Sequence, residues 1–229
     1  VEYGDTLQLR IKVVDFENYT VFNYSVRVSI VADDEQLLTF SGVTDENGEV
    51  VFNITVNLAP SDYQLLIESD GNTYYDELHA SRTLHIEQEK TVLIVFDSEG
   101  TCTDTTVIFA KLTEEDGQPL ANKLVTFVIS FDNGSELALG SVKTNESGFA
   151  VLNIRLDYDA STYQIIAKFA GDTYFKECYG SAKLIVIKEV TLIIPLKTEL
   201  LDCGDKLIVR LLDDDKTTSI KDAKVKLSI

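Results

Sequence analysis

The sequence predicts an all-β protein built from tandem β-sandwich domains, with little or no helix. The first observation behind this prediction is an internal duplication, in which Val43–Ile54 and Lys143–Ile154 align at an offset of 100 residues. The second is the spacing of apolar residues, which alternate with polar residues in short runs bounded by turn residues. No run keeps the 3.6-residue apolar period of an amphipathic helix.

The duplication extends well beyond that stretch. It aligns Thr44 with Thr144. An identical residue also lies 100 positions after each of Gly48, Tyr63, Gln64, Gly71, Thr73, Tyr74, Ser81 and Thr91. A period near 100 residues is too long for a solenoid repeat and suits an autonomous domain. We therefore expect one domain at 1–88, a second at 89–188, and the start of a third at 189–229.

The first domain contains six alternating runs that we expect to form strands. They are Leu7–Val13, Tyr24–Ile30, Leu37–Val43, Val50–Val56, Tyr63–Ile67 and Thr83–Ile86. Between the third and fourth runs, Asp45–Gly48 is expected to form the tight turn of a β-hairpin, because Asn-Gly supplies the positive φ that such turns need. Asn53 and Thr55 are expected to face water in the fourth strand.

The second domain repeats this order with one strand added at its front. The expected strands are Thr91–Phe96, Thr105–Leu112, Leu124–Phe131, Ala138–Val142, Phe149–Leu156, Tyr163–Phe169 and Lys183–Ile187. Asn133 and Gly134 are expected to form a hairpin turn. Seven strands in about 100 residues, with turn signals every 8–12 residues, are typical of an immunoglobulin-like sandwich.

A third domain begins at Val190–Leu196, which matches Thr91–Phe96, and Cys203–Leu207 then matches Tyr3–Leu7. The first domain has no counterpart of Thr91–Phe96 within the sequence. Two explanations remain open: the sequence is a segment of a longer protein, or neighbouring subunits supply the missing strands. Strand donation is physically sensible because an incomplete sandwich exposes a sheet edge that other strands can pair with.

Four segments carry a resemblance to a known class of repeat. They are Gly4–Leu7, Glu115–Ala121, Thr144–Ala150 and Tyr163–Tyr174. Their order resembles the immunoglobulin-like repeats of large prokaryotic surface proteins, including invasin- and intimin-type adhesins and the adhesin-like and S-layer-associated proteins of archaea. The first domain departs from the pattern at Glu17–Thr20, where the repeats carry an Asp-x-x-Gly-x-Pro turn. The resemblance implies an extracellular structural or adhesive role, and no active site.

Composition restricts the partners. The net charge is −18, which argues against binding to nucleic acid or to an anionic membrane surface because like charges repel. Such a charge also keeps an exposed protein soluble. No apolar run reaches 18 residues, so we expect no membrane span in this segment.

Five Asn-X-Ser/Thr sequons are candidate N-glycosylation sites, at Asn18, Asn23, Asn53, Asn133 and Asn145. Four of them lie in or beside expected turns, and the fifth is on the water-facing side of a strand. Covalent N-glycans on these residues would suit a cell-surface protein. The alternative is that a turn-rich composition produces sequons by chance.

The three cysteines are candidates for disulfides. Cys102 and Cys203 occupy matching positions in the second and third domains, whereas Cys178 precedes the last strand of the second domain. In a standard sandwich, Cys102 and Cys178 lie at opposite ends, which disfavours a bridge between them. Links between subunits or domains, or free thiols, are the alternatives.

No metal site or cofactor is expected from the motifs. The cysteines and histidines lack zinc spacing, and no EF-hand spacing occurs. The acidic clusters Asp33–Glu35, Glu114–Asp116 and Asp213–Asp215 are read as solvated turns, with calcium binding as the alternative. No catalytic motif occurs either, so we expect that this segment is not an enzyme.

The favoured function is that of a structural module in an extracellular cell-surface polymer: a surface filament, an S-layer component or an adhesin stalk. Its partners would be copies of itself or other surface proteins. One alternative is a binding module that recognises a glycan or protein through the loops Asp70–Ser81 and Gly171–Ser181, which carry the pairs Tyr74-Tyr75 and Tyr174-Phe175. Aromatics repeated in both domains are, however, also typical core anchors. Another alternative is an accessory region of an exported enzyme.

Overall fold

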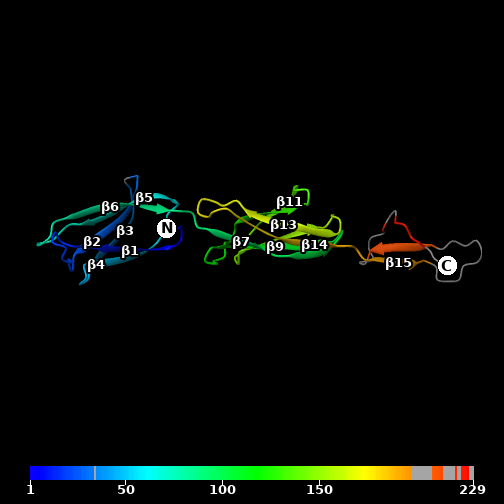
Figure 1. Ribbon diagram of the computed structural model, residues 1–229, viewed down its shortest axis with the longest axis horizontal. Helices are drawn as coiled ribbons and strands as arrows, with labels where there is room; N and C mark the ends of the chain where they lie inside the picture. The colour runs from blue at the N-terminus through cyan, green and yellow to red at the C-terminus, as the bar shows by residue number, and fades with distance from the viewer. Residues whose placement is uncertain (34, 197–207, 214–219, 221–222, 227–229) are drawn as a thin grey trace, which may run out of the picture. The chain divides into compact units, whose positions relative to one another are not determined.

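The computed structural model describes residues 1–33, 35–196, 208–213, 220 and 223–226. The regular structure in these ranges consists of strands, without a helix (Figure 1). The all-β prediction is therefore confirmed. The strands are β1 (Thr6–Lys12), β2 (Ser25–Ala32), β3 (Glu35–Val43), β4 (Glu49–Thr55), β5 (Ser61–Ser69), β6 (Leu78–Ile86), β7 (Thr91–Val95), β8 (Ser98–Thr101), β9 (Thr105–Glu114), β10 (Leu124–Ser130), β11 (Glu136–Lys143), β12 (Phe149–Arg155), β13 (Ser161–Phe169), β14 (Cys178–Ile187), β15 (Thr191–Pro195) and β16 (Val209–Asp213).

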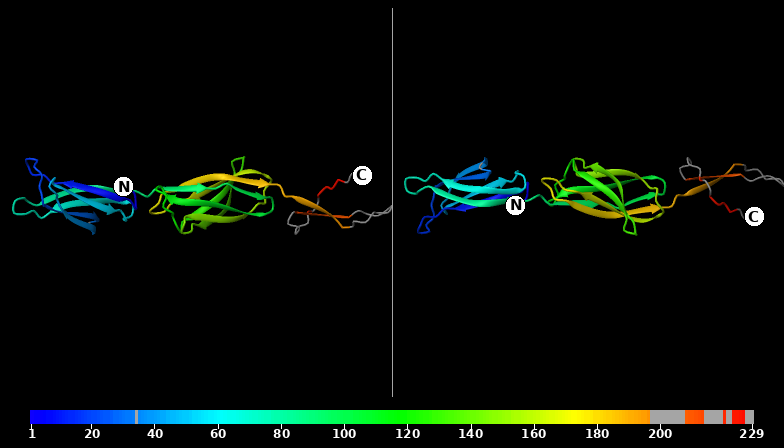
Figure 2. Two further views of the ribbon diagram at one scale, coloured as in Figure 1. Left: turned by 90° about the horizontal axis from the view of Figure 1, so that it is seen from below. Right: turned by 90° about the horizontal axis from the view of Figure 1, so that it is seen from above.

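Strands β1–β6 form a sandwich of two antiparallel sheets, which we call the first sandwich (Figure 2). One sheet has the order β3-β2-β5-β6, and the other pairs β1 with β4. Both sheets contribute to one core, because the apolar side chains of each strand alternate with polar ones. In β4, for example, Phe52 and Ile54 are buried, whereas Asn53 and Thr55 are exposed as expected.

Strands β7–β14 form the second sandwich, which has one strand more than predicted. Its sheets have the orders β11-β10-β13-β14-β8 and β12-β9-β7. The expected front strand ends at Val95, and the chain then changes sheet, so that β8 pairs in parallel with β14. The sequence did not reveal β8 because Ser98–Thr101 has no apolar alternation. Gly100 fits there because it has no side chain: a Cβ atom would lie 2.6 Å from Leu156 Cδ1.

The two expected hairpin turns have different outcomes. Asn133-Gly134 joins β10 to β11, which pair in one sheet, and Gly134 has a φ of 80°, as expected. Asp45–Gly48 is a tight turn too, with the Gly48 amide donating to the Asp45 carbonyl over 2.9 Å. The hairpin prediction is wrong here, because β3 and β4 belong to different sheets. A local turn signal does not reveal which strands the chain will pair.

Beyond the second sandwich, β15 pairs antiparallel with β16. By packing, the chain divides into two compact units. The first unit comprises Val1–Leu93, Leu112–Leu120 and Lys168–Tyr179, and the second comprises Ile94–Lys111, Ala121–Ala167 and Gly180–Ile229. The boundaries expected at residues 88 and 188 remain predictions.

Candidate functional site

All five sequon asparagines are exposed. Asn18 and Asn23 have positive φ values of 67° and 54°, which places them in turns. Asn133 and Asn145 also lie in turns, where their side-chain oxygens accept hydrogen bonds from backbone amides. Asn53 projects from the outer face of β4 and accepts a hydrogen bond from Gln8. Every candidate acceptor is therefore accessible, and glycosylation itself remains a prediction.

Cys102 and Cys178 are free thiols, each partly buried. The Cys102 amide donates to the carbonyl of Ile187 at the end of β14, whereas Cys178 begins that strand. A strand of this length separates the two cysteines by about 30 Å, far outside disulfide range. A bridge within the domain is thus ruled out by the fold. Burial raises the pKa of the Cys178 thiol, although a hydrogen bond with Thr91 acts in the opposite direction. The raised pKa makes this thiol a poor nucleophile. Cys203 lies outside the described residues.

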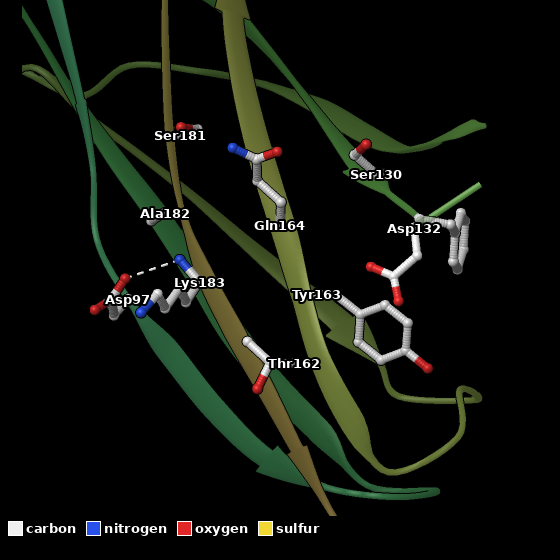
Figure 3. Close-up of a pocket in the computed structure, with 10 residues that line it drawn as sticks. Asp97, Ser130, Asp132, Thr162, Tyr163, Gln164, Ser181, Ala182 and Lys183 are labelled. Atoms are coloured by element: carbon white, nitrogen blue, oxygen red, sulfur yellow. Dashed lines mark hydrogen bonds between the residues drawn. The ribbon is translucent and has the colours of Figure 1, made fainter. Parts of the chain in front are cut away.

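One hollow of the second unit lies on the outer face of the five-stranded sheet (Figure 3). Its lining includes Asp97, Asp132, Tyr163, Gln164 and Lys183. The Asp97 carboxylate accepts a hydrogen bond from the Lys183 amide over 2.8 Å, and Asp132 lies on the opposite side of the hollow. The lining contains no histidine or cysteine, so it holds no nucleophile paired with a histidine base. The carboxylate, amide and hydroxyl groups of this lining can offer polar contacts to a ligand.

The two aromatic residues in the long loop of the first sandwich have different roles. In the first sandwich, the Tyr75 ring packs edge-on against Tyr24 at 5.9 Å, and the Tyr24 hydroxyl donates to the Asp76 carbonyl. Tyr75 is therefore an anchor of the loop, while Tyr74 is 88% exposed. Hence one residue of the pair supports the fold and the other is available for contacts.

Within the first compact unit, the corresponding loop packs against the segment between β6 and β7. Tyr174 and Phe175 place their ring centroids 4.6 Å and 6.0 Å from that of Tyr3. The Glu89 amide donates to the Tyr174 carbonyl, and the Glu89 carbonyl accepts from the Lys176 amide, each over 2.8 Å. These backbone bonds hold the connecting segment in an extended conformation.

The Glu89 side chain occupies an acidic hollow in this unit. It is 7% exposed and has no hydrogen-bond or ion-pair partner among the described residues. Burial raises the pKa of its carboxyl to about 7, and the nearby negative charges act in the same direction; they belong to Glu2, Asp5, Glu114 and Asp116. The carboxyl therefore lies in a place that disfavours its charged form.

Two lysines partly balance these acids. Lys90 bridges Glu2 and Glu115 at 2.9 Å and 3.2 Å, and Lys176 pairs with Glu87 at 2.9 Å. The hydrogen bond from Lys176 lowers the pKa of Glu87. Because these pairs are largely exposed, each adds little stability.

The role of Glu89 was missed at the sequence level, where Glu114–Asp116 was read as a solvated turn. The available signal is that Glu89 and Glu189 share the 100-residue offset. Among the described residues, no group of three or more His, Cys, Asp or Glu side chains is arranged to hold a metal ion. In the same part of the chain, no helix is long and apolar enough to span a membrane.

These features define a class: tandem β-sandwiches whose conspicuous surface groups are turn asparagines and exposed loop aromatics. No protein-family profile matches the sequence, and no curated protein matches it. Several solved structures do match this chain. Invasin, a bacterial integrin-binding protein, is 14% identical with a TM-score of 0.51, over 97% of this chain and 46% of that one.

Two other matching structures have lower scores. A tetra-tandem repeat from the extending region of a large adhesion protein is 10% identical, with a TM-score of 0.40 over 96% of this chain and 62% of that one. Native Escherichia coli alpha-2-macroglobulin is 11% identical, with a TM-score of 0.33 over 94% of this chain and 16% of that one. The chain thus spans about half the length of the invasin structure. At these identities the likeness to invasin shows the fold alone, a tandem array of immunoglobulin-like sandwiches.

Proposed function

We propose that this chain is a load-bearing structural module of an extracellular cell-surface protein, in an adhesin stalk, a surface filament or an S-layer. It carries tension between its two ends and has no catalytic role of its own. Its partners are copies of itself or other surface proteins. The fold that it shares with invasin supports a surface role, and the duplicated sandwiches support a repetitive mechanical one.

The parallel pairing of β8 with β14 is the observation that carries the mechanical proposal. In this ladder Leu184 lies opposite Ser98 and Ile187 lies opposite Thr101. Tension on the amino-terminal side of β8 and on the carboxy-terminal side of β14 acts in opposite directions along two parallel strands. The ladder is therefore loaded in shear, and its hydrogen bonds must break together rather than one after another.

Labelling of intact cells of the source organism tests the surface location. An antibody against the folded chain is expected to decorate unpermeabilised cells, and external protease is expected to remove the signal. Labelling that depends on permeabilisation would contradict the proposal. A cytoplasmic protein of the same cells serves as the control for leakage.

N-glycans on the five sequons are part of the proposal, since all five asparagines are exposed. Mass spectrometry of peptides from the native protein is expected to find glycan mass on Asn18, Asn23, Asn53, Asn133 or Asn145. Unmodified peptides at all five positions would remove the glycan component and leave the mechanical component standing. Asn57, which is not in a sequon, is the internal control.

A second candidate function is recognition of a glycan or protein through the loop that carries Tyr74. The 88% exposure of this ring favours it, because exposed aromatic rings stack on sugars or anchor protein interfaces. Binding on a glycan array that is lost in Tyr74→Ala and kept in Tyr74→Phe would support this function. Equal binding by all three proteins would contradict it.

A further inference from the structure

Five turns among the described residues share one hydrogen-bond pattern. In each turn, the amide of the fourth residue donates to the carbonyl of the first, and the amide of the first donates to the carbonyl of the fifth. The fourth residue has a positive φ in all five, between 67° and 93°. The turns are Asp15–Tyr19, Asp45–Glu49, Glu114–Gln118, Phe131–Ser135 and Asn145–Phe149.

The turn Asp15–Tyr19 differs from the other four at two positions. In those four, the fourth residue is glycine, which adopts a positive φ without strain, and the second residue is acidic. The acidic residues are Glu46, Glu115, Asp132 and Glu146. In Asp15–Tyr19, the second residue is Phe16 and the fourth is Asn18. Neither residue is needed to form the turn, because the other four turns form without them.

The aromatic rings of this turn lie in water. Phe16 is fully exposed, and Tyr19 is 70% exposed. An acidic side chain at the position of Phe16 is well solvated, whereas an exposed phenyl ring gains nothing from the hydrophobic effect. Two exposed rings within one five-residue turn therefore favour contact with a group outside the core of the sandwich.

The asparagine of the same turn can carry such a group. Asn18, Tyr19 and Thr20 form a sequon, and all three residues are exposed. The Asn18 side chain has no hydrogen-bond partner among the described residues, so a sugar attached to it is free to orient. The Cα atoms of Phe16 and Asn18 are at most about 7 Å apart, because one residue separates them.

A sugar attached to Asn18 has the chemistry to cover the phenyl ring. The faces of a sugar ring carry C–H groups, and the face of an aromatic ring is electronegative, so that the two attract and exclude water. Covalent attachment makes this contact intramolecular, which favours even a weak stack.

We propose that the turn Asp15–Tyr19 is an aromatic platform for the N-glycan of Asn18, and that the sugars nearest the asparagine stack on Phe16. The occupant of the platform is the covalent glycan of this chain. This inference rests on the glycan component of the proposed function. It gives that glycan a structural role, because a stacked sugar covers the exposed ring and stabilises the first sandwich.

A double-mutant cycle on the full chain tests the platform. The cycle comprises the parent, Phe16→Ala, Asn18→Gly and the double variant, where glycine removes the acceptor and keeps the positive φ. All four proteins are prepared from the source organism and from a host without N-glycosylation. Amide hydrogen exchange of β2 and β5, the inner strands of the four-stranded sheet, reports the unfolding of the first sandwich.

Coupling between Phe16 and Asn18 is expected only in the glycosylated proteins. There it should change the folding equilibrium by about two- to tenfold, the range of a single aromatic contact. In the unglycosylated proteins the two substitutions are expected to be additive. Tyr74→Ala in place of Phe16→Ala is the matched control, because Tyr74 is 88% exposed in a loop without a sequon. It is expected to show no coupling in either preparation.

Three results would overturn the platform, and mass spectrometry of the Asn18 peptide separates them. Additive substitutions in protein that carries the glycan on Asn18 would overturn the stacking and leave glycosylation standing. Equal coupling in both preparations would mean that Phe16 contacts Asn18 itself. An unmodified Asn18 in the native protein would overturn the platform and remove this sequon from the proposed function, whereas the mechanical role would be unaffected.

Discussion

Thr44 is a buried polar residue whose hydroxyl joins two backbone segments of the first sandwich. It donates to the Val21 carbonyl over 2.5 Å and accepts from the Tyr24 amide over 3.0 Å. Thr144 stands at the same place in the second sandwich, where its hydroxyl accepts from the Lys123 amide. Each hydroxyl therefore satisfies polar backbone groups at the chain crossing between sheets.

Thr44→Val is expected to lower the free energy of unfolding by about 1–3 kcal/mol, because it keeps the side-chain shape and leaves the Tyr24 amide without an acceptor. Urea denaturation followed by circular dichroism measures the effect. Thr55→Val on the exposed face of β4 is the matched control and is expected to change stability by less than about 0.5 kcal/mol. Equal effects of the two substitutions would contradict this role for Thr44.

Two glycines illustrate different constraints on single residues. At Gly100, a methyl group would lie 2.6 Å from Leu156 Cδ1 and 2.9 Å from Thr106 Cβ. At Gly134 no atom lies within 4 Å of that position, but the φ of 80° disfavours any other residue. The first glycine is required for space and the second for backbone conformation.

Gly100→Ala is therefore expected to cost about 1–3 kcal/mol through overpacking, and Gly134→Ala about 1 kcal/mol through strain. Combining each glycine substitution with Leu156→Val distinguishes the two causes in thermal denaturation. The loss of stability in Gly100→Ala/Leu156→Val is expected to be smaller than the sum of the two single losses. In Gly134→Ala/Leu156→Val it is expected to equal that sum. Additive costs at Gly100 would contradict overpacking.

The residue scale is where the sequence is least informative. The offset identified Thr44 and Thr144 as a repeated position, but their hydrogen bonds depend on segments that only the fold brings together. The sequons were readable directly, and their exposure agrees with the expected turns. Glu89 was not recognised, because its acidic neighbours come from two stretches that are distant from it in sequence, residues 1–5 and 114–116.

Among the elements, the segment between β6 and β7 combines extended pairing with a buried charge. Its backbone is fixed by hydrogen bonds to Tyr174 and Lys176, and the Glu89 side chain is 7% exposed. Burial raises the pKa of Glu89 from its ordinary 4.5 to about 7. A carboxyl with a raised folded-state pKa contributes stability below its unfolded pKa and loses it as the pH rises through the folded pKa.

The first compact unit is thus expected to lose stability between about pH 5 and pH 8, by at most about 3 kcal/mol from Glu89. Glu89→Gln removes the charge and is expected to be more stable than the parent at pH 8 and similar to it at pH 5. Urea denaturation followed by tyrosine fluorescence across this range measures the difference. Glu46→Gln, at an exposed turn, is the control. A parent and Glu89→Gln with parallel pH profiles would contradict the assignment.

Strand positions were largely predictable, because every predicted strand of the two sandwiches corresponds to an observed one. The period-2 alternation marks the half-buried strands directly, as in β4. Strand pairing was less predictable: Asp45–Gly48 was expected to close a hairpin, and β8 was not expected at all. Both depend on long-range sheet order, which local periodicity does not encode.

At the scale of the whole molecule, duplication is the dominant feature. Each sandwich has its own core, and the same six strands recur in the same sheet positions. Such arrays unfold domain by domain under tension, because the cooperative unit is the single core. Parallel pairing of β8 with β14 places the second sandwich under shear when its ends are pulled apart.

Single-molecule pulling on the full chain, held at its two ends, tests the load-bearing role most directly. The second sandwich is expected to resist extension and then unfold in one event. That event should lengthen the chain by roughly 300 Å. The residues from Thr91 to Ile187 span roughly 350 Å when extended at about 3.6 Å each, and the folded sandwich already spans roughly 30–40 Å, the length of a ten-residue strand. Smooth extension at low force, without a discrete event of that size, would contradict a mechanical function for this protein.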